Sequence, residues 1–186
     1  MSLQDLELGP LTHLLGTWEG DKGADVAPSS TRKTEKTLYR ERMVFAPTGR
    51  VDNHEQILYG LRYNTTAWRL GQPDPFHEEL GYWLWDAKTS QVMRCFMVPR
   101  GVTVIAGGKV KADARSYKIA AKLGSPTYGI CSNEFLHKEF RTVKYELKII
   151  HHDATSFSYD ENTQLKIKGT AKIFNHRDKN TLHKIT

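Results

Sequence analysis

The chain has 186 residues, of which 39% are hydrophobic and 26% charged, and its formal net charge is +6. This length suits a single domain over residues 1–186 that can bury a sizeable core, and 4 Trp, 8 Tyr and 7 Phe residues supply much of its apolar area. No stretch approaches the roughly 18 apolar residues of a membrane-spanning helix, and no secretory leader begins the chain. We therefore expect a cytoplasmic protein without a membrane span.

The first predicted elements are two short helical turns near the N-terminus. Gly9-Pro10 divides them, because proline interrupts a helix that would otherwise continue. The leucines that recur there at roughly helical spacing are Leu6, Leu8, Leu11, Leu14 and Leu15.

After Trp18, apolar and polar residues alternate, which is the period of a β-strand. Turn residues punctuate the alternation, among them "APTGR" at 46–50 and "DENT" at 160–163. The predicted strands are 34–45, 50–63, 79–86, 91–99, 101–110, 114–122, 142–150, 155–161 and 164–174. About ten short strands without a long intervening helix indicate an all-β fold, a single antiparallel up-and-down β-barrel of the calycin or lipocalin type.

Two segments are less regular, namely "RLGQPDPFHEE" at 69–79 and "LGSPTYGICSNEFLHKEFR" at 123–141. Both are long for a hairpin connection, and such loops at a barrel mouth often carry function. The second reads as an insertion, whose role the sequence leaves open.

The positive charge is spread along the chain rather than clustered. In "TVKYELKII" and "QLKIKGTAKI" the lysines occupy the polar positions of alternating strands, so we expect a solvated sheet face and no nucleic-acid partner. Cys95 and Cys131 lack the C-x-x-C spacing of zinc or dithiol sites, and we expect both to be buried thiols.

No nucleophile elbow, P-loop, H-E-x-x-H or dinucleotide glycine fingerprint is present. Two residues still suggest a site. Glu41 shares a strand face with Tyr39, Met43 and Phe45, so an inward-facing Glu41 would be buried and would need a partner such as an arginine, as a structural ion pair or a ligand contact. His77 begins the strand "FHEELGYW", where it would meet a ligand at the barrel mouth or bond a neighbouring loop.

Four segments taken together resemble the nitrobindin family of haem-binding β-barrels, which are related in shape to fatty-acid-binding proteins. These segments are "LLGTWEGDKG", "LYRERMVF", "FHEELGYW" and "PRGVTVIAGG", which occur in the family's order and, with the C-terminal region, span nearly the whole chain. A related domain lies at the C-terminus of a human THAP-type zinc-finger protein.

The resemblance implies that haem b is held near one open end of the barrel, with its iron bound by a histidine close to the C-terminus. It also implies a ferric haem that reacts with nitric oxide and isomerises peroxynitrite to nitrate, so any enzyme would be a peroxynitrite isomerase. His176 in "FNHRDKN" matches the ligand position best, and His183 is the second choice. His77 and Glu41 are the further residues that we expect to line the cofactor site.

The sequence leaves two readings of His176 open. A ligating imidazole holds its second nitrogen against a carbonyl or carboxylate, and Asp178 stands two residues away. However, Asp178, Asn180 and Thr181 are also typical turn and cap residues, so "HRDKNT" would equally fold the chain back from its last strand.

Three function classes therefore remain. The first is a barrel that binds haem b, and the second is a haem-free carrier of a hydrophobic or amphipathic small ligand. The third is a haem-free enzyme with Glu41 and His77 as acid and base. The sequence does not decide the physiological ligand or the oligomeric state, a dimer included.

Overall fold

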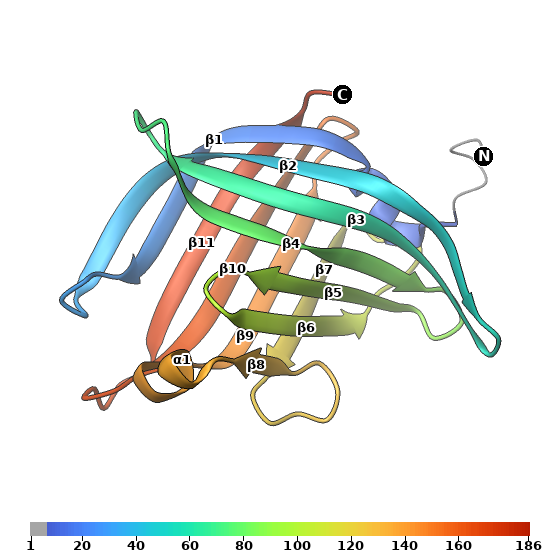
Figure 1. The fold of residues 1–186 in the computed structure, drawn as a ribbon. Coiled ribbons are helices and arrows are strands. Elements are labelled where there is room, and N and C mark those ends of the chain that lie inside the picture. Colours follow the sequence, from blue (N-terminus) through green and yellow to red (C-terminus); the bar gives the residue numbers. More distant parts are fainter. Residues whose placement is uncertain (1–6) are drawn as a thin grey trace.

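The computed structural model describes residues 7–186, which form an all-β structure of antiparallel strands (Figure 1). Within this part of the chain, ten strands close into a barrel and β8 is added beside β6, so the predicted fold class is confirmed. The strands are β1 (Gly16–Pro28), β2 (Thr34–Asn53), β3 (Gln56–Arg69), β4 (Pro75–Asp86), β5 (Gln91–Val98), β6 (Val102–Lys109), β7 (Ser116–Lys122), β8 (Ile130–Ser132), β9 (Phe140–His151), β10 (Ser156–Ile167) and β11 (Phe174–Lys184).

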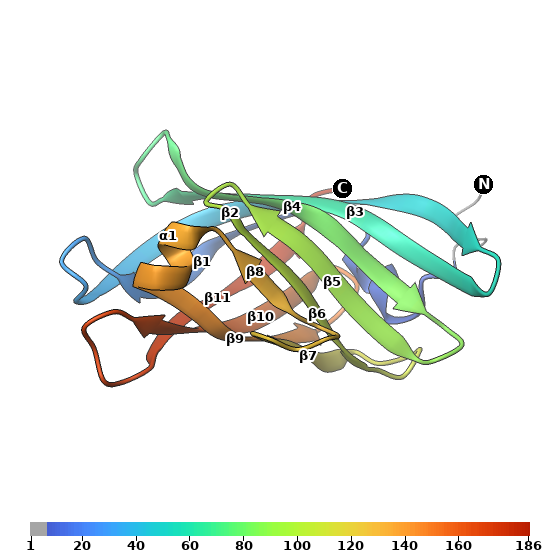
Figure 2. The ribbon, with the colours of Figure 1, turned by 60° about the horizontal axis from the view of Figure 1, so that its bottom comes forward.

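The strands follow a meander that the pairing of β11 with β1 closes. The seam between β6 and β7 is the shortest pairing around the barrel, with Gly107 opposite Ala120. The first half of β6 pairs instead with β8, which lies beside it (Figure 2). Closure leaves few free strand edges, which are sites of unwanted pairing in open sheets.

Alternation along each strand decides which side chains face the interior. In β2, Tyr39, Glu41 and Met43 are buried, whereas Arg40 and Arg42 between them are exposed. Successive side chains of a strand point to opposite faces, so the interior of the barrel receives every second residue. The inward face of β2 is the one that the sequence pattern predicted.

A 3-10 helix, Gly9–Leu14, closes one end of the barrel. Leu11 and Leu14 are fully buried, and the indole of Trp18 donates a hydrogen bond to the carbonyl of Leu14 at 2.7 Å. The helix corresponds to the second predicted helical turn. The first predicted turn falls largely on residues 1–6, outside the described part of the chain.

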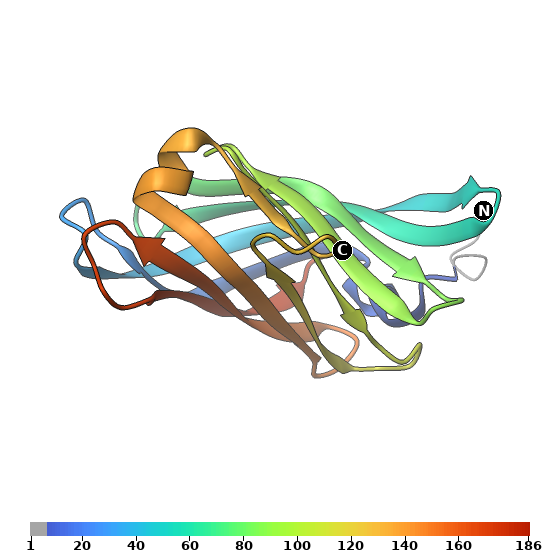
Figure 3. The same ribbon diagram turned by 90° about the horizontal axis from the view of Figure 1, so that it is seen from below.

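The opposite end of the barrel carries helix α1, Glu134–Glu139, beside the β1–β2 and β10–β11 hairpins (Figure 3). Glu139 joins these elements, because its carboxylate lies 2.7 Å from Arg32 Nη2 and 2.8 Å from Lys168 Nζ. Both β8 and α1 lie within the segment 123–141, which the sequence showed as irregular.

The predicted strand 50–63 is wrong, because a turn at His54 and Glu55 divides β2 from β3. His54 adopts a positive φ of 56°, and its backbone N–H donates to the Asp52 side chain at 3.0 Å. The predicted turn at 46–50 instead lies inside β2, where the register with β3 shifts between Pro47 and Gly49.

The predicted strand 164–174 is also wrong, because a turn divides this segment between the end of β10 and the start of β11. Strand β10 continues to Ile167 through the "DENT" segment, and Gly169, with φ 83°, lies in the following turn. The "HRDKNT" segment, which the sequence allowed as a turn, belongs to β11.

None of the helices within residues 7–186 is long and apolar enough to cross a membrane.

Candidate functional site

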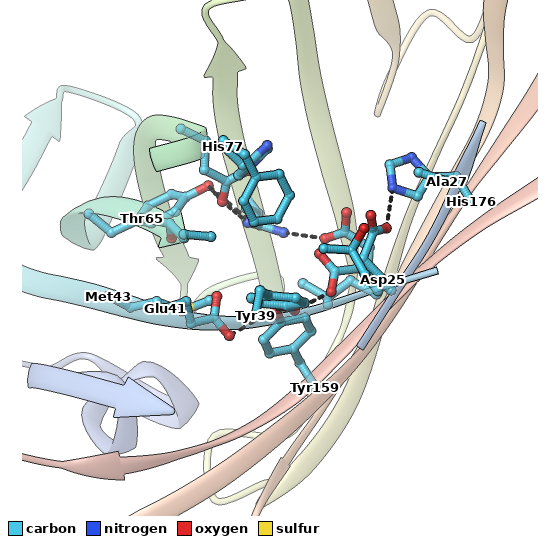
Figure 4. Close-up of a pocket in the computed structure, with 18 of the residues that line it drawn as sticks. Asp25, Ala27, Tyr39, Glu41, Met43, Thr65, His77, Tyr159 and His176 are labelled. Atoms are coloured by element: carbon cyan, nitrogen blue, oxygen red, sulfur yellow. Dashed lines mark hydrogen bonds and ion pairs between the residues drawn. The ribbon is translucent and has the colours of Figure 1, made fainter. Parts of the chain in front are cut away.

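A cavity of about 280 Å³ occupies the interior of the barrel, above Leu14 of the 3-10 helix. The exposed residues Glu35, Arg69 and Arg100 belong to its lining, so it reaches the surface at the end away from that helix. Its apolar walls include Ala27, Met43, Phe45, Ala67, Phe76, Leu147, Ile149 and Phe157. Figure 4 shows that polar side chains from several strands also point into it.

Arg94 of β5 is the centre of the first polar cluster. Its guanidinium forms an ion pair with Glu79 of β4 and a second with Glu161 of β10, 3.0 Å away, so it connects two walls of the barrel. Arg94 Nε also donates to the hydroxyl of Tyr63 at 2.9 Å, and Tyr145 donates to Glu161 at 2.6 Å. Burial opposes ionisation of Glu79, but Arg94 and His77 outweigh it and lower the Glu79 pKa to about 2.

The second cluster places two tyrosine hydroxyls between two carboxyl groups. Tyr159 donates to Glu41 Oε1 at 2.9 Å, and the hydroxyls of Tyr159 and Tyr39 lie 2.7 Å apart. Tyr39 in turn donates to Asp178 Oδ1, and Asn180 donates to Glu41 Oε1 at 2.7 Å. Burial raises the pKa of Glu41 to about 8, and the charge of Asp178 adds to the effect. Burial and Glu161 raise the pKa of Asp178 to about 7.

His176 lies on the inward face of β11, near the open end of the barrel, with 35% of its side chain exposed. Its Nε2 lies 2.8 Å from Asp25 Oδ1 of β1, and the labelled side chains face each other in Figure 4. Nδ1 makes no hydrogen bond with any residue of the described chain. Burial alone would lower the pKa of His176, but the bond to Asp25 and its charge raise it overall.

His77 and Glu41 line the same cavity as His176. His77 Nε2 stands 3.9 Å from Glu79 Oε2, and its side chain is 38% exposed. Burial opposes its protonation, but Glu79 raises its pKa above the ordinary value. An acid–base role for Glu41 and His77 stays a prediction.

The structure places two sequence-based details differently. The arginine partner expected for Glu41 pairs with Glu79 instead, and Glu41 is satisfied by the neutral groups of Tyr159 and Asn180. The carboxylate beside His176 belongs to Asp25, whereas Asp178 accepts from Tyr39.

His183 faces the outside of the barrel. It lies on β11 as an exposed residue, at odd spacing from His176. The cavity lining includes His176 and omits His183.

Sequence reasoning did not name Asp25, Arg94 or Glu161 as members of the site. Arg94 lies between apolar residues in "QVMRCFMV", and this interruption of an otherwise apolar strand was the signal for a buried charge. Asp25 and Glu161 offered no comparable signal, because each joins the site through a partner far away in the sequence. Within residues 7–186, no cluster of three or more His, Cys, Asp or Glu side chains is arranged to hold a metal ion.

The fold is that of a closed β-barrel with an internal, ligand-sized cavity, and comparison with protein families assigns the chain to a family of such barrels. Residues 7–184 match the family described as the THAP4-like, haem-binding β-barrel domain, and the chain belongs to this family. The nitrobindin-like resemblance read from the four sequence segments is thereby confirmed.

Among solved structures, the chain is similar to the crystal structure of Rv2717c from M. tuberculosis. The TM-score is 0.68 at 21% sequence identity, and the match covers 97% of this chain and 98% of that one. At this identity the likeness supports the fold alone. No curated protein matches the chain.

Proposed function

We propose that this barrel binds haem b in its cavity, with His176 as the axial ligand of the iron. The observation that carries the proposal is the position of His176, an inward histidine at the open end whose Nε2 is held by Asp25. Ligating histidines are commonly oriented by a carboxylate on the second ring nitrogen, and here Nδ1 is left without a partner among the described residues.

The remaining lining is compatible with a flat, largely apolar cofactor that carries acidic groups at one edge. Phe76, Met43 and Ala67 provide apolar surface against which the porphyrin ring would pack. Arg69 and Arg100 lie in the exposed part of the lining, where their charges suit the two haem propionates.

Bound haem would supply a ferric iron for reaction with nitric oxide and for conversion of peroxynitrite to nitrate, as the family resemblance implies. In this chain, Asp25 would fix the orientation of the His176 ring and raise its basicity as a ligand. His77 stands at the same cavity with a raised pKa and would offer a proton near the ligand.

We also propose that the protein works in the cytoplasm. Its two cysteines, Cys95 and Cys131, are both free thiols, as expected in a reducing compartment, although the expectation that both are buried is wrong, since Cys95 is half-buried and Cys131 is exposed.

The test is a hemin titration of the full chain, followed through the Soret band. We expect saturable binding by the wild type and at least about tenfold weaker binding by His176→Ala, because the iron loses its protein ligand. His183→Ala is the matched control, since it removes a histidine from the outer face of the same strand. A hemin Soret band that neither shifts nor saturates on titration with the wild type, or a His176→Ala variant with unchanged affinity, would contradict the proposal.

A further inference from the structure

We propose that the inner part of the cavity contains a site for a small organic cation, a protonated amine or guanidinium on a compact body, bound by Glu41, Asp178 and Thr65. This site is separate from the haem ligand His176 and does not depend on the function proposed above.

The first observation is that two carboxyl groups in the cavity have no cationic partner among the described residues. Both hydrogen-bond donors to Glu41, from Tyr159 and Asn180, are neutral and both bond Oε1. The only donor to Asp178 within the described chain is the Tyr39 hydroxyl, which bonds Oδ1. One oxygen of each carboxyl group is therefore left for a ligand.

The basic side chains near this pair are already engaged. Arg94 is shared between Glu79 and Glu161, and His176 is held by Asp25. The lining as a whole contains more carboxylates than positive side chains.

The register of the strands also brings three carboxylate side chains close to one another. Asp25, Asp178 and Glu161 lie directly opposite one another on the adjacent strands β1, β11 and β10. Like charges in directly opposite positions destabilise a sheet. Asp25 already has a basic partner in His176 and Glu161 has one in Arg94, so a ligand cation beside Asp178 would relieve the remaining repulsion.

The second, independent observation is an unsatisfied hydroxyl. Thr65 of β3 lines the cavity and is only 4% exposed, and its Oγ1 finds no hydrogen-bond partner in the described chain. Thr65 is opposite Met43 and Glu41 is opposite Ala67, so Thr65 and Glu41 are diagonal neighbours on β3 and β2. Figure 4 shows both on the same side of the cavity. Buried hydroxyls are rarely left without a partner, and a bound ammonium or guanidinium would supply the missing donor.

The raised pKa of Glu41 agrees with this assignment, because burial without a nearby cation disfavours the charged carboxylate.

The experiment is isothermal titration calorimetry of the haem-free full chain at neutral pH with three probes of nearly equal size. These are phenethylamine, 2-phenylethanol and 3-phenylpropionate, which carry a positive, a neutral and a negative head group. We expect phenethylamine to bind at least about tenfold more tightly than the alcohol, and the acid to bind most weakly, because only the amine forms charge-assisted bonds with the carboxylates.

Two variants test the assigned residues. Glu41→Gln should weaken phenethylamine binding by about tenfold or more, because an amide cannot form the ion pair. Thr65→Val should weaken it while leaving the fold at least as stable, because it removes an unsatisfied buried hydroxyl and keeps the shape. Glu78→Gln is the matched control, since Glu78 is an exposed carboxylate of β4 outside the barrel and the change should have no effect.

Equal affinity for the amine and the alcohol, or no phenethylamine binding at all, would overturn the inference. If Glu41→Gln fails to fold, the probe comparison in the wild type and the Thr65→Val variant still decide it. If the chain binds hemin but does not prefer phenethylamine over 2-phenylethanol, only the inference of a cation site is refuted. If it prefers phenethylamine but does not bind hemin, only the haem proposal is refuted.

Discussion

At the scale of single residues, Arg94 contributes most to the internal electrostatics of the barrel. It is almost fully buried and pairs with Glu79 and Glu161, while the rings of Phe96 and Tyr63 lie within 4.4 Å and 5.3 Å of its guanidinium carbon. A buried ion pair adds little net stability over a well-packed apolar replacement, but losing one partner leaves a buried charge unpaired. Arg94 is therefore the residue whose removal should cost the most.

We expect Arg94→Met to lower the free energy of unfolding by about 3–5 kcal/mol at neutral pH, because Glu79 and Glu161 lose their cation. The deficit should shrink as the pH falls. In the wild type the Glu79 pKa is lowered from 4.5 to about 2, so its contribution is present above pH 4.5 and is lost as the pH falls toward 2. In the variant the carboxyl is protonated more easily, so acid no longer removes a stabilising charge.

Urea unfolding at neutral and acid pH measures both effects. Arg62→Met is the matched control, because Arg62 is exposed on the outer face of β3 and its loss should change stability by less than about 0.5 kcal/mol. Equal stability of the two variants at neutral pH would show that Arg94 does not hold the cluster together.

From the residue pattern alone, residues of the site were predictable only where strand alternation placed them, whereas His176 was named through the family resemblance. Glu41 and His77 were found because each sits at an identifiable position of an alternating segment, and both line the cavity. The pairings of Asp25 with His176 and of Arg94 with Glu161 join positions 151 and 67 residues apart. Such pairings depend on the register of the closed barrel, which no local pattern encodes.

At the scale of elements, a bulge in β1 positions Tyr39. The register of β1 with β2 shifts between Gly20 and Gly23, and Gly23 lies opposite Tyr39. A Cβ added at Gly23 would overlap the carbon atoms of the Tyr39 ring, so only glycine leaves room for the ring where its hydroxyl reaches Asp178.

We expect Gly23→Ala to cost about 1–3 kcal/mol of folding free energy, because the added methyl group displaces the Tyr39 ring. In a Tyr39→Ala background the same change should cost much less, since the ring is gone. A double-mutant cycle by urea unfolding gives the coupling. Strictly additive effects would mean that Gly23 is required for its backbone rather than for the ring.

Strand boundaries were less predictable than the fold class. The turn at His54 is formed by the backbone N–H of His54, which donates to the Asp52 carboxylate, and by the left-handed conformation of His54. It contains no glycine or proline, the residues that usually signal a turn. The turn between β10 and β11 does contain a glycine, Gly169, which has a positive φ. The alternation of apolar and polar residues nevertheless continues from 164 to 174 and concealed this turn.

At the scale of the whole molecule, closure determines what the barrel can bind. The 3-10 helix closes one end of the barrel, and the cavity opens at the other end. His176 lies near this opening, and the polar clusters around Glu41 and Arg94 lie deeper in the cavity. Alternation and short connections predicted this architecture, since few other folds accommodate so many short antiparallel strands. The chemistry of the cavity emerges only when strands from both halves of the chain meet.

The measurement that tests the central claim most directly is a crystal structure of the full chain loaded with hemin. We expect the haem in the barrel cavity, with its iron bonded to a ring nitrogen of His176 and the Asp25 carboxylate bonded to the other nitrogen. Haem bound outside the barrel, or iron bonded to a different residue such as His77 or His183, would contradict the account.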